Sequence, residues 1–267
     1  MASPESSRVR LAQHLLASPL VVWVRTLGDF EMNARDATSA LLKLLDGSVL
    51  HDIMRQIHSR PAKQALFRHA GDDPMLRAQN LALLLRQLRE FYQEELQQLI
   101  VMPLPDVITI SRDPFTEQSV KEFKKLLLLM LGSAVQCERK EMFIEKIKDL
   151  NIDVQAAIVV HIQEVTQTPE NVLELRTAEL AEDETARNLL SQLQRLAEQR
   201  DRLTETIIEL NQKMEEFQKT PLSSLNTVPA VPQLSSPLGE MGTGVGRGLA
   251  VELAESKASL RRLRREL

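Results

Sequence analysis

Apolar residues recur at three- and four-residue spacings along most of the chain, which is the period of amphipathic helices. We predict helices at 9–16, 19–27, 36–45, 49–57, 75–100, 120–137, 139–150 and 153–168. The helix at 120–137 is apolar on nearly every side, so we expect it to lie at the centre of a helical domain.

Turn and cap residues separate these segments. Gly47 follows the helix at 36–45 and suits the left-handed position after a helix end. The pair Asp73–Pro74 starts the helix at 75–100, and Pro103 follows its end. Asp153 can accept hydrogen bonds from the first turn of the helix at 153–168, which Pro169 terminates.

The predicted helix at 153–168 carries more apolar residues than one buried face needs. They are Val154, Ala157, Ile158, Val159, Val160, Ile162 and Val165. Because successive residues of a helix are 100° apart, this set occupies more than one face. Part of it must therefore face solvent, a neighbouring element or a partner.

A regular four-three spacing begins at Leu189 and indicates a coiled coil. The seam consists of Leu193, Leu196, Leu203, Ile207, Leu210 and Met214, with Arg200 at one core position. Leucine at the d positions, with a β-branched residue at one a position, favours a parallel dimer. The alternative is an amphipathic helix that packs on the first domain, but the other positions are densely charged.

Composition divides the chain into five zones. We predict a helical domain at 1–168, a helical connector at 169–188, a coiled coil at 189–219, a flexible linker rich in Pro, Ser, Thr and Gly at 220–248, and the start of further coiled coil at 249–267. The last segment stops within its pattern, so we expect the natural chain to continue as a longer coiled coil.

The composition supports an all-α fold and narrows the function. Apolar residues make up 43% of the chain but aromatic residues only 3%, which favours helix packing over β-sandwiches. A net charge of −4 offers no basic surplus for nucleic acid. The single Cys137 indicates a buried, reduced thiol in a cytosolic protein. No segment has the ~20 apolar residues of a transmembrane span.

We find no pattern typical of catalysis or cofactor binding. The five histidines show no metal-ligand spacing with each other or with cysteine. The alternating glycines at 242–248 follow no predicted strand, so a flexible spacer explains them better than a phosphate-binding turn. The sequence therefore predicts a protein that is not an enzyme, with no metal and no cofactor.

Several blocks resemble a known family. The segments 20–24, 45–50, 80–85, 113–115 and 124–129 resemble the Hook domain, a divergent calponin-homology fold followed by an extra helix. The segments 94–100, 134–137, 161–166 and 205–210 are similar to the Hook-related Girdin–Daple–Gipie group. Within that group the sequence looks most like Gipie.

The resemblance implies an adaptor that links cargo to the dynein motor. Hook domains bind a helix of the dynein light intermediate chain in a groove, and their extra helix carries a Gln, a Met four residues on and an Ile three further. Gln155, Val159 and Ile162 match that spacing here, with Val in place of Met, and we place Ile158 in the same site. The resemblance also implies a cytoplasmic, cytoskeleton-associated protein that reaches endomembranes through its cargo.

Two alternatives remain open. Calponin-homology domains bind actin, and Hook domains have been linked to microtubules, so the chain is also a candidate for direct filament binding. A filament surface is acidic, and Lys121, Lys124 and Lys125 form a small basic cluster that suits it. A general role as a signalling scaffold also fits the family.

Overall fold

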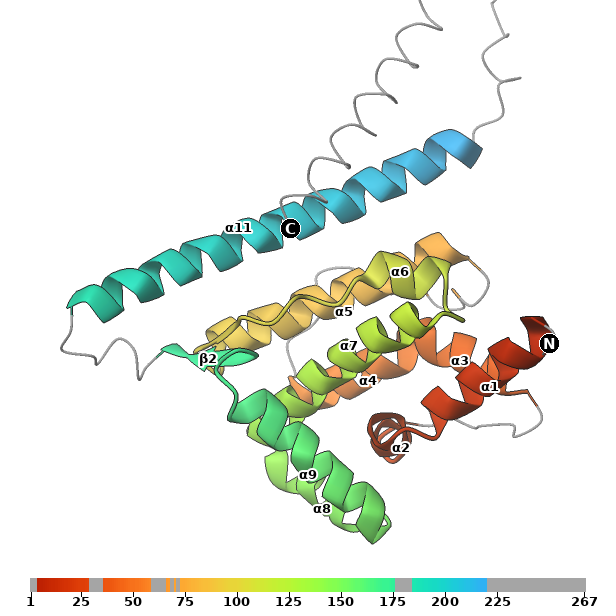
Figure 1. The fold of residues 1–267 in the computed structure, drawn as a ribbon, viewed down its shortest axis with the longest axis horizontal. Coiled ribbons are helices and arrows are strands. Elements are labelled where there is room, and N and C mark those ends of the chain that lie inside the picture. The colour runs from red at the N-terminus through yellow and green to blue at the C-terminus, as the bar shows by residue number, and fades with distance from the viewer. Residues whose placement is uncertain are drawn as a thin grey trace, which may run out of the picture. The chain divides into compact units, whose positions relative to one another are not determined.

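The computed structural model describes residues 4–28, 36–58, 66–67, 70, 73–175 and 184–219. The chain divides into two compact units, residues 1–197 and 198–267. In the described part of the first unit, helices and one short two-stranded ribbon form a domain (Figure 1). The predicted linker at 220–248 and the predicted second coiled coil at 249–267 lie outside the described residues.

Most of the predicted helices form close to their predicted positions. The elements are α1 (Pro4–Leu16), α2 (Pro19–Arg25), α3 (Ala37–Leu45), α4 (Ser48–Ile57), α5 (Pro74–Glu94), β1 (Gln98–Ile100), α6 (Val107–Arg112), α7 (Glu117–Gln136), α8 (Lys140–Lys148), α9 (Ile152–Thr166), β2 (Val172–Glu174) and α11 (Glu184–Lys219).

Helix α7 is the central helix of the domain, as its apolar sequence predicts. It contacts α2, α4, α5, α6, α8 and α9. Its side chains from Leu126 to Leu131 are all buried. Because neighbours cover α7 on several sides, its apolar residues are not confined to one stripe.

The turn between α3 and α4 is held by a buried polar side chain from α5. Gly47 adopts a φ of 83°, the left-handed conformation predicted from the sequence. Asn80 lies against this turn and donates a hydrogen bond of 2.7 Å from Nδ2 to the carbonyl oxygen of Asp46. The carbonyl oxygen of Asn80 lies 2.9 Å from Nε2 of His51, which is buried in α4. Asn80 therefore joins α5 to the two consecutive helices α3 and α4.

The helix predicted at 75–100 ends earlier than its apolar pattern indicates. Helix α5 stops at Glu94, and Gln97 adopts a positive φ of 52° that cannot continue a right-handed helix. The Gln97 side chain donates hydrogen bonds to the carbonyl oxygens of Gln93 (3.2 Å) and Glu94 (3.1 Å) at the helix end. The next residues form β1, in which Leu99 and Ile100 are buried.

The connector predicted as helix at 169–188 contains a strand instead. Residues Val172–Glu174 form β2, which pairs antiparallel with β1 so that Ile100 lies opposite Val172. Asn171 extends the pairing, because its carbonyl oxygen accepts hydrogen bonds from the amides of Val101 and Met102. Pairing with β1 satisfies backbone groups that a helix would satisfy internally, and it ties the chain after α9 back to the domain.

Helix α6 has no counterpart among the predicted helices. Asp106 caps it by accepting hydrogen bonds from the amides of Ile108 and Thr109, both at 3.0 Å. Glu122 of α7 in turn accepts a 2.9 Å hydrogen bond from the amide of Asp106. A six-residue helix is too short for hydrophobic periodicity to reveal, so its cap is the signal that could have found it.

Candidate partner-binding face

Helix α9 carries the predicted partner-binding residues. Its N-cap is Asn151, whose side chain accepts a 2.9 Å hydrogen bond from the amide of Asp153. The prediction that Asp153 is the cap is therefore wrong by two residues. Asp153 instead lies in the first turn, where its negative charge interacts favourably with the helix dipole.

One side of α9 is packed against the domain. Ile158 and Val165, seven residues apart and so on the same side of the helix, are both completely buried. At Gly132 of α7, an added Cβ would lie 2.9 Å from Cγ2 of Val165 and 2.3 Å from the hydroxyl oxygen of Tyr92. Gly132 is therefore the position that lets α9 approach α7 so closely.

The other side of α9 exposes apolar surface. Val159 is 47% exposed, Val160 is 60% exposed and Ile152 is 72% exposed. The sequence prediction that this helix has more apolar surface than its domain covers is confirmed. Ile152 and Val160 were not among the predicted site residues. Val160 belongs to the predicted apolar surplus, whereas Ile152 precedes the predicted start of the helix.

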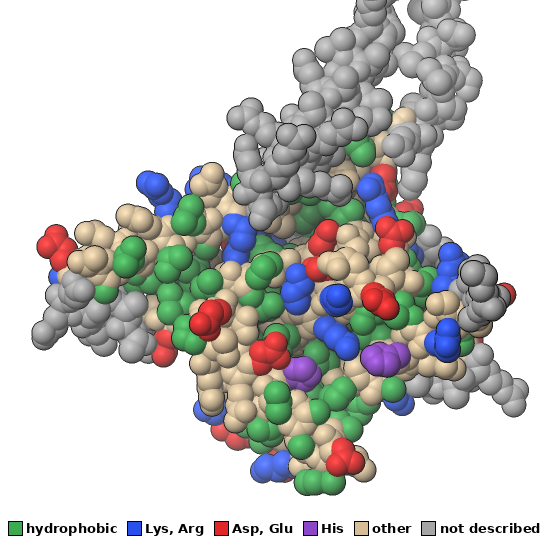
Figure 2. All heavy atoms as spheres, viewed as in Figure 1, with side chains coloured by type: hydrophobic (Ala, Val, Ile, Leu, Met, Phe, Trp, Pro, Cys, Tyr) green, Lys and Arg blue, Asp and Glu red, His purple; other side chains and the backbone are tan. Residues whose placement is uncertain are grey.

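The three residues Gln155, Val159 and Ile162, which we call the α9 face, lie along the boundary between the buried and the exposed sides. Gln155 and Ile162 are half-buried and Val159 is exposed. Spacings of four and three residues place them on one side of the helix. The structure thus brings these three predicted residues together at the surface. Figure 2 shows hydrophobic side chains at the surface in the region of α8 and α9.

Gln155 already has a role inside the domain. Its Nε2 donates hydrogen bonds to the carbonyl oxygens of Lys148 at 2.9 Å and Leu150 at 2.7 Å. These bonds fasten the turn between α8 and α9. The amide protons are therefore used within the chain, and Oε1 is the atom that a partner's donor would approach.

Ile158 differs from the other predicted site residues. It is completely buried, so in this conformation it offers no surface to a partner. The sequence could not separate Ile158 from Val159, because both lie in an apolar run and only the direction of packing tells them apart. Ile158 supports the α9 face from beneath.

The α9 face carries little charge. His161 Nδ1 and Glu164 Oε2 of the same helix lie 3.1 Å apart, and both side chains are partly exposed. Asp153 is the acidic residue of the first turn. An apolar strip with so few charges suits the apolar side of an amphipathic helix better than a charged polymer.

Nothing in the described residues points to a metal or a catalytic centre. In those residues there is no group of three or more His, Cys, Asp or Glu side chains that could hold a metal ion. Burial raises the pKa of the Cys137 thiol, which works against the reactive thiolate form. Burial also raises the pKa of Tyr92, whose hydroxyl donates a 3.0 Å hydrogen bond to the carbonyl oxygen of Leu129. Among the described helices none has the length and hydropathy to cross a membrane.

The predicted coiled-coil seam lies on one continuous helix, α11. Its residues are exposed or half-exposed: Leu193 and Leu196 are exposed, and Leu203, Ile207, Leu210 and Met214 are partly exposed. The buried residues of α11 are Leu190, Ala197, Ile208 and Asn211, none of which is a seam position. The exposed and half-exposed apolar residues of α11 thus include the predicted seam positions, and their pairing in a coiled coil stays a prediction.

Comparison with known families decides what this domain is. The HOOK domain family matches residues 16–164, more than half of the chain. The chain belongs to the Hook-domain family. The prediction of an all-α, calponin-homology-like Hook domain is thereby confirmed, and a long helix, α11, follows it where a coiled coil was predicted. Hook-domain proteins of this kind are scaffolds rather than enzymes, which agrees with the sequence prediction.

The curated relatives place the chain within the Girdin and Daple group of Hook-domain proteins. It is 44% identical to Daple from mouse over 264 residues, 97% of this chain and 13% of that protein. It is 41% identical to Girdin from mouse, over 96% of this chain and 14% of that protein. A solution structure of the conserved domain of mouse HOOK1 is 27% identical, with a TM-score of 0.45, over 57% of this chain and 91% of that one.

The prediction that the chain is most like Gipie is wrong. Coiled-coil domain-containing protein 88B from mouse, which is Gipie, is 37% identical over 234 residues, 85% of this chain and 15% of that protein. Daple is more similar and matches a longer part of the chain. The blocks used for the comparison are shared across the group, so they could not separate its members.

Proposed function

We propose that this Hook domain is the motor-binding module of a cytoskeletal adaptor. In this proposal the α9 face binds an amphipathic helix of the dynein light intermediate chain, and α11 pairs with a second copy as a parallel coiled coil. The observation that supports it most strongly is the exposed apolar surface of α9. That surface persists although the helix is already packed on α7 through Ile158 and Val165.

The physics of the proposed contact is the burial of apolar area. Val159 and Ile162 would leave water on contact with the partner, at about 25 cal/mol per Å² of buried apolar surface. Gln155 would add one hydrogen bond, with Oε1 accepting from a partner donor. The anchor residues of such a helix lie three or four residues apart, which matches the spacing of the α9 face.

Direct filament binding is the weaker alternative. It relied on Lys121, Lys124 and Lys125, but Nζ of Lys125 lies 2.5 Å from a carboxylate oxygen of the largely buried Glu122. One of the three positive charges is thus compensated within the domain. Co-sedimentation of the chain with actin filaments and with microtubules at several salt concentrations tests this alternative directly.

The proposal is tested with two alanine variants on the same helix. Ile162→Ala removes part of the α9 face, and we expect it to weaken binding of a light intermediate chain helix peptide by about fivefold or more, since truncating a buried anchor costs over 1 kcal/mol. Val160→Ala removes an exposed valine outside the face and is expected to leave the affinity unchanged. Isothermal titration calorimetry measures both.

Equal affinities of the two variants would refute the assignment of the face. Gln155→Ala is a poorer probe, because it also removes the hydrogen bonds to Lys148 and Leu150. We expect that variant to lose both thermal stability and affinity, so it serves only beside Ile162→Ala.

A further inference from the structure

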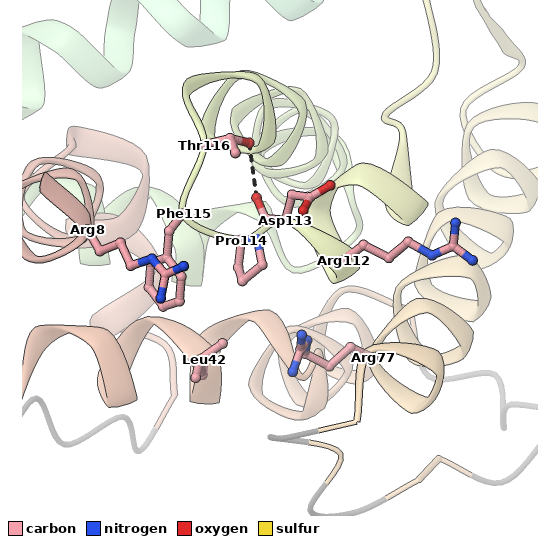
Figure 3. Close-up of a pocket in the computed structure, with 8 residues that line it drawn as sticks. All are labelled: Arg8, Leu42, Arg77, Arg112, Asp113, Pro114, Phe115 and Thr116. Atoms are coloured by element: carbon pink, nitrogen blue, oxygen red, sulfur yellow. Dashed lines mark hydrogen bonds between the residues drawn. The ribbon is translucent and has the colours of Figure 1, made fainter. Parts of the chain in front are cut away.

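A cavity on the domain, lined from α1, α3, α5 and the turn from α6 to α7, has no part in the proposed α9 contact. Its volume is about 320 Å³, within the range of small-ligand sites. The lining residues are Arg8, Leu42, Arg77, Arg112, Asp113, Pro114, Phe115 and Thr116 (Figure 3). Three of these eight side chains are guanidinium groups, and one is a carboxylate.

Arg77 provides a rigid cationic wall. Its side chain belongs to α5 and is only 4% exposed. Nη2 donates a 2.5 Å hydrogen bond to the carbonyl oxygen of Ser111, which fixes the orientation of the guanidinium group. A guanidinium held in place before a ligand arrives loses little conformational freedom on binding.

Arg8 provides a second cation from a different helix. Its guanidinium carbon lies 5.8 Å from the centre of the Phe115 ring, within the range of a cation–π contact. In Figure 3 the side chains of Arg8 and Arg77 extend from opposite walls toward the space between Leu42 and Pro114. The cavity therefore has two guanidinium groups that approach one space from two directions.

The remaining walls set the polarity of the cavity. Arg112 extends away from the space between Arg8 and Arg77. Asp113 lies between Pro114 and Arg112 (Figure 3). Leu42, Pro114 and Phe115 supply apolar surface beside the two cations. A ligand that fits this lining carries a compact negative charge on an apolar body.

We propose that this cavity binds a phosphate monoester group that is attached to an apolar carrier. A phosphate accepts hydrogen bonds on three oxygens in different directions, whereas a carboxylate accepts a bidentate pair in one plane. Guanidinium groups that come from opposite walls suit the former arrangement. The apolar carrier would lie on Leu42, Pro114 and the Phe115 ring.

The test measures binding of phenyl phosphate to the full chain by isothermal titration calorimetry at constant ionic strength. We expect saturable binding with one site per chain. Inorganic phosphate and benzoate are titrated in parallel. Equal affinity for inorganic phosphate would overturn the apolar carrier, and equal affinity for benzoate would overturn the preference for phosphate.

Charge variants identify the site. Arg8→Gln is expected to weaken phenyl phosphate binding on the order of tenfold, because it removes one charge-assisted hydrogen-bonding partner. Asp113→Asn removes the one carboxylate among the lining residues and is expected to strengthen phenyl phosphate binding. Arg10→Gln is the matched control, since Arg10 is an exposed residue of the same helix that does not line the cavity.

The result that overturns the proposal is the absence of saturable binding, or an effect of Arg10→Gln as large as that of Arg8→Gln. Equal effects of the two variants would mean that the ligand responds only to the total positive charge of α1. Arg8, Arg10 and Asp113 are all exposed, so the three variants are expected to fold like the parent chain. Their thermal unfolding checks this independently of binding.

Discussion

At the residue scale, the first half of the domain depends on a few buried polar side chains. Asn80 is 1% exposed and hydrogen-bonds with its side chain to the backbone of Asp46 and Phe67. Its own carbonyl oxygen pairs with His51. Because each buried polar atom would cost free energy without a partner, such a cluster fixes one arrangement of its helices.

His51 makes the stability of the domain depend on pH. Burial lowers the pKa of His51 below the ordinary histidine value of about 6.5, so the folded state favours the neutral ring. As the pH falls below that ordinary value, the unfolded chain takes up a proton that the folded chain resists. The stabilisation is therefore complete above the ordinary pKa and is lost as the pH falls through the folded pKa.

The variant His51→Gln tests this dependence. Glutamine keeps a donor for the carbonyl oxygen of Asn80 but does not titrate. We expect a lower stability at neutral pH and a flatter loss of stability as the pH falls below about 6.5. Urea unfolding at several pH values measures both. His14→Gln, an exposed position of α1, is the control, and an unchanged profile in His51→Gln would contradict the argument.

At the element scale, the close packing of α9 on α7 depends on the absence of a side chain at Gly132. An added Cβ would approach the Tyr92 hydroxyl oxygen to 2.3 Å and Val165 to 2.9 Å. Tyr92 is completely buried, and its hydroxyl donates a hydrogen bond to the carbonyl oxygen of Leu129, so the tyrosine side chain has little room to move. The strain must then be relieved by α9, which rests on this position through Val165.

We expect Gly132→Ala to destabilise the domain by about 1–3 kcal/mol, the usual cost of overpacking. Amide hydrogen exchange in α9 should become faster, because the added methyl group displaces the helix from its position on α7. Ser133→Ala at the neighbouring buried position adds no volume, and we expect it to leave exchange in α9 unchanged. A stable Gly132→Ala protein with normal exchange in α9 would show that the contact is not needed.

The elements also show what the sequence can and cannot predict. The central position of α7 follows from its all-round apolar residues, and the turn at Gly47 follows from a glycine after a helix. The strands β1 and β2 could not be predicted, because Leu99 and Ile100 fit the end of a helical stripe as well as a strand. In α9 the sequence predicted surplus apolar surface, but it could not tell that Ile158 faces inward and Val159 outward.

At the scale of the whole molecule, the proposed adaptor needs two copies. In the predicted seam of α11, Leu193 is 41% exposed and Leu196 is 58% exposed, and pairing with a second α11 would bury both. Arg200 lies at a core position of the seam and pairs with Asp201 at 2.8 Å. A charge in a coiled-coil core lowers the stability of the dimer, so we expect this chain to dimerise weakly.

Replacing Arg200 with leucine should therefore strengthen the dimer, since it substitutes apolar burial for a charge at the core. Leu203→Asp should abolish the dimer for the opposite reason. Sedimentation equilibrium over a range of chain concentrations gives the association constants. Arg202→Ala changes an exposed position outside the seam and serves as the control. A monomer in all four proteins would refute the predicted pairing of this segment.

The central claim is that α9 offers its face to a partner helix, and Val159 tests it most directly. The measurement is the fluorescence anisotropy of a labelled light intermediate chain helix titrated with the parent chain, Val159→Met and Val159→Asp. We predict that Val159→Met binds about fourfold more tightly, since methionine adds one non-hydrogen atom, a thioether sulfur, whose burial contributes about as much as that of a methylene, ≈ 0.8 kcal/mol, and that Val159→Asp does not bind. Identical affinities for all three proteins would contradict the account.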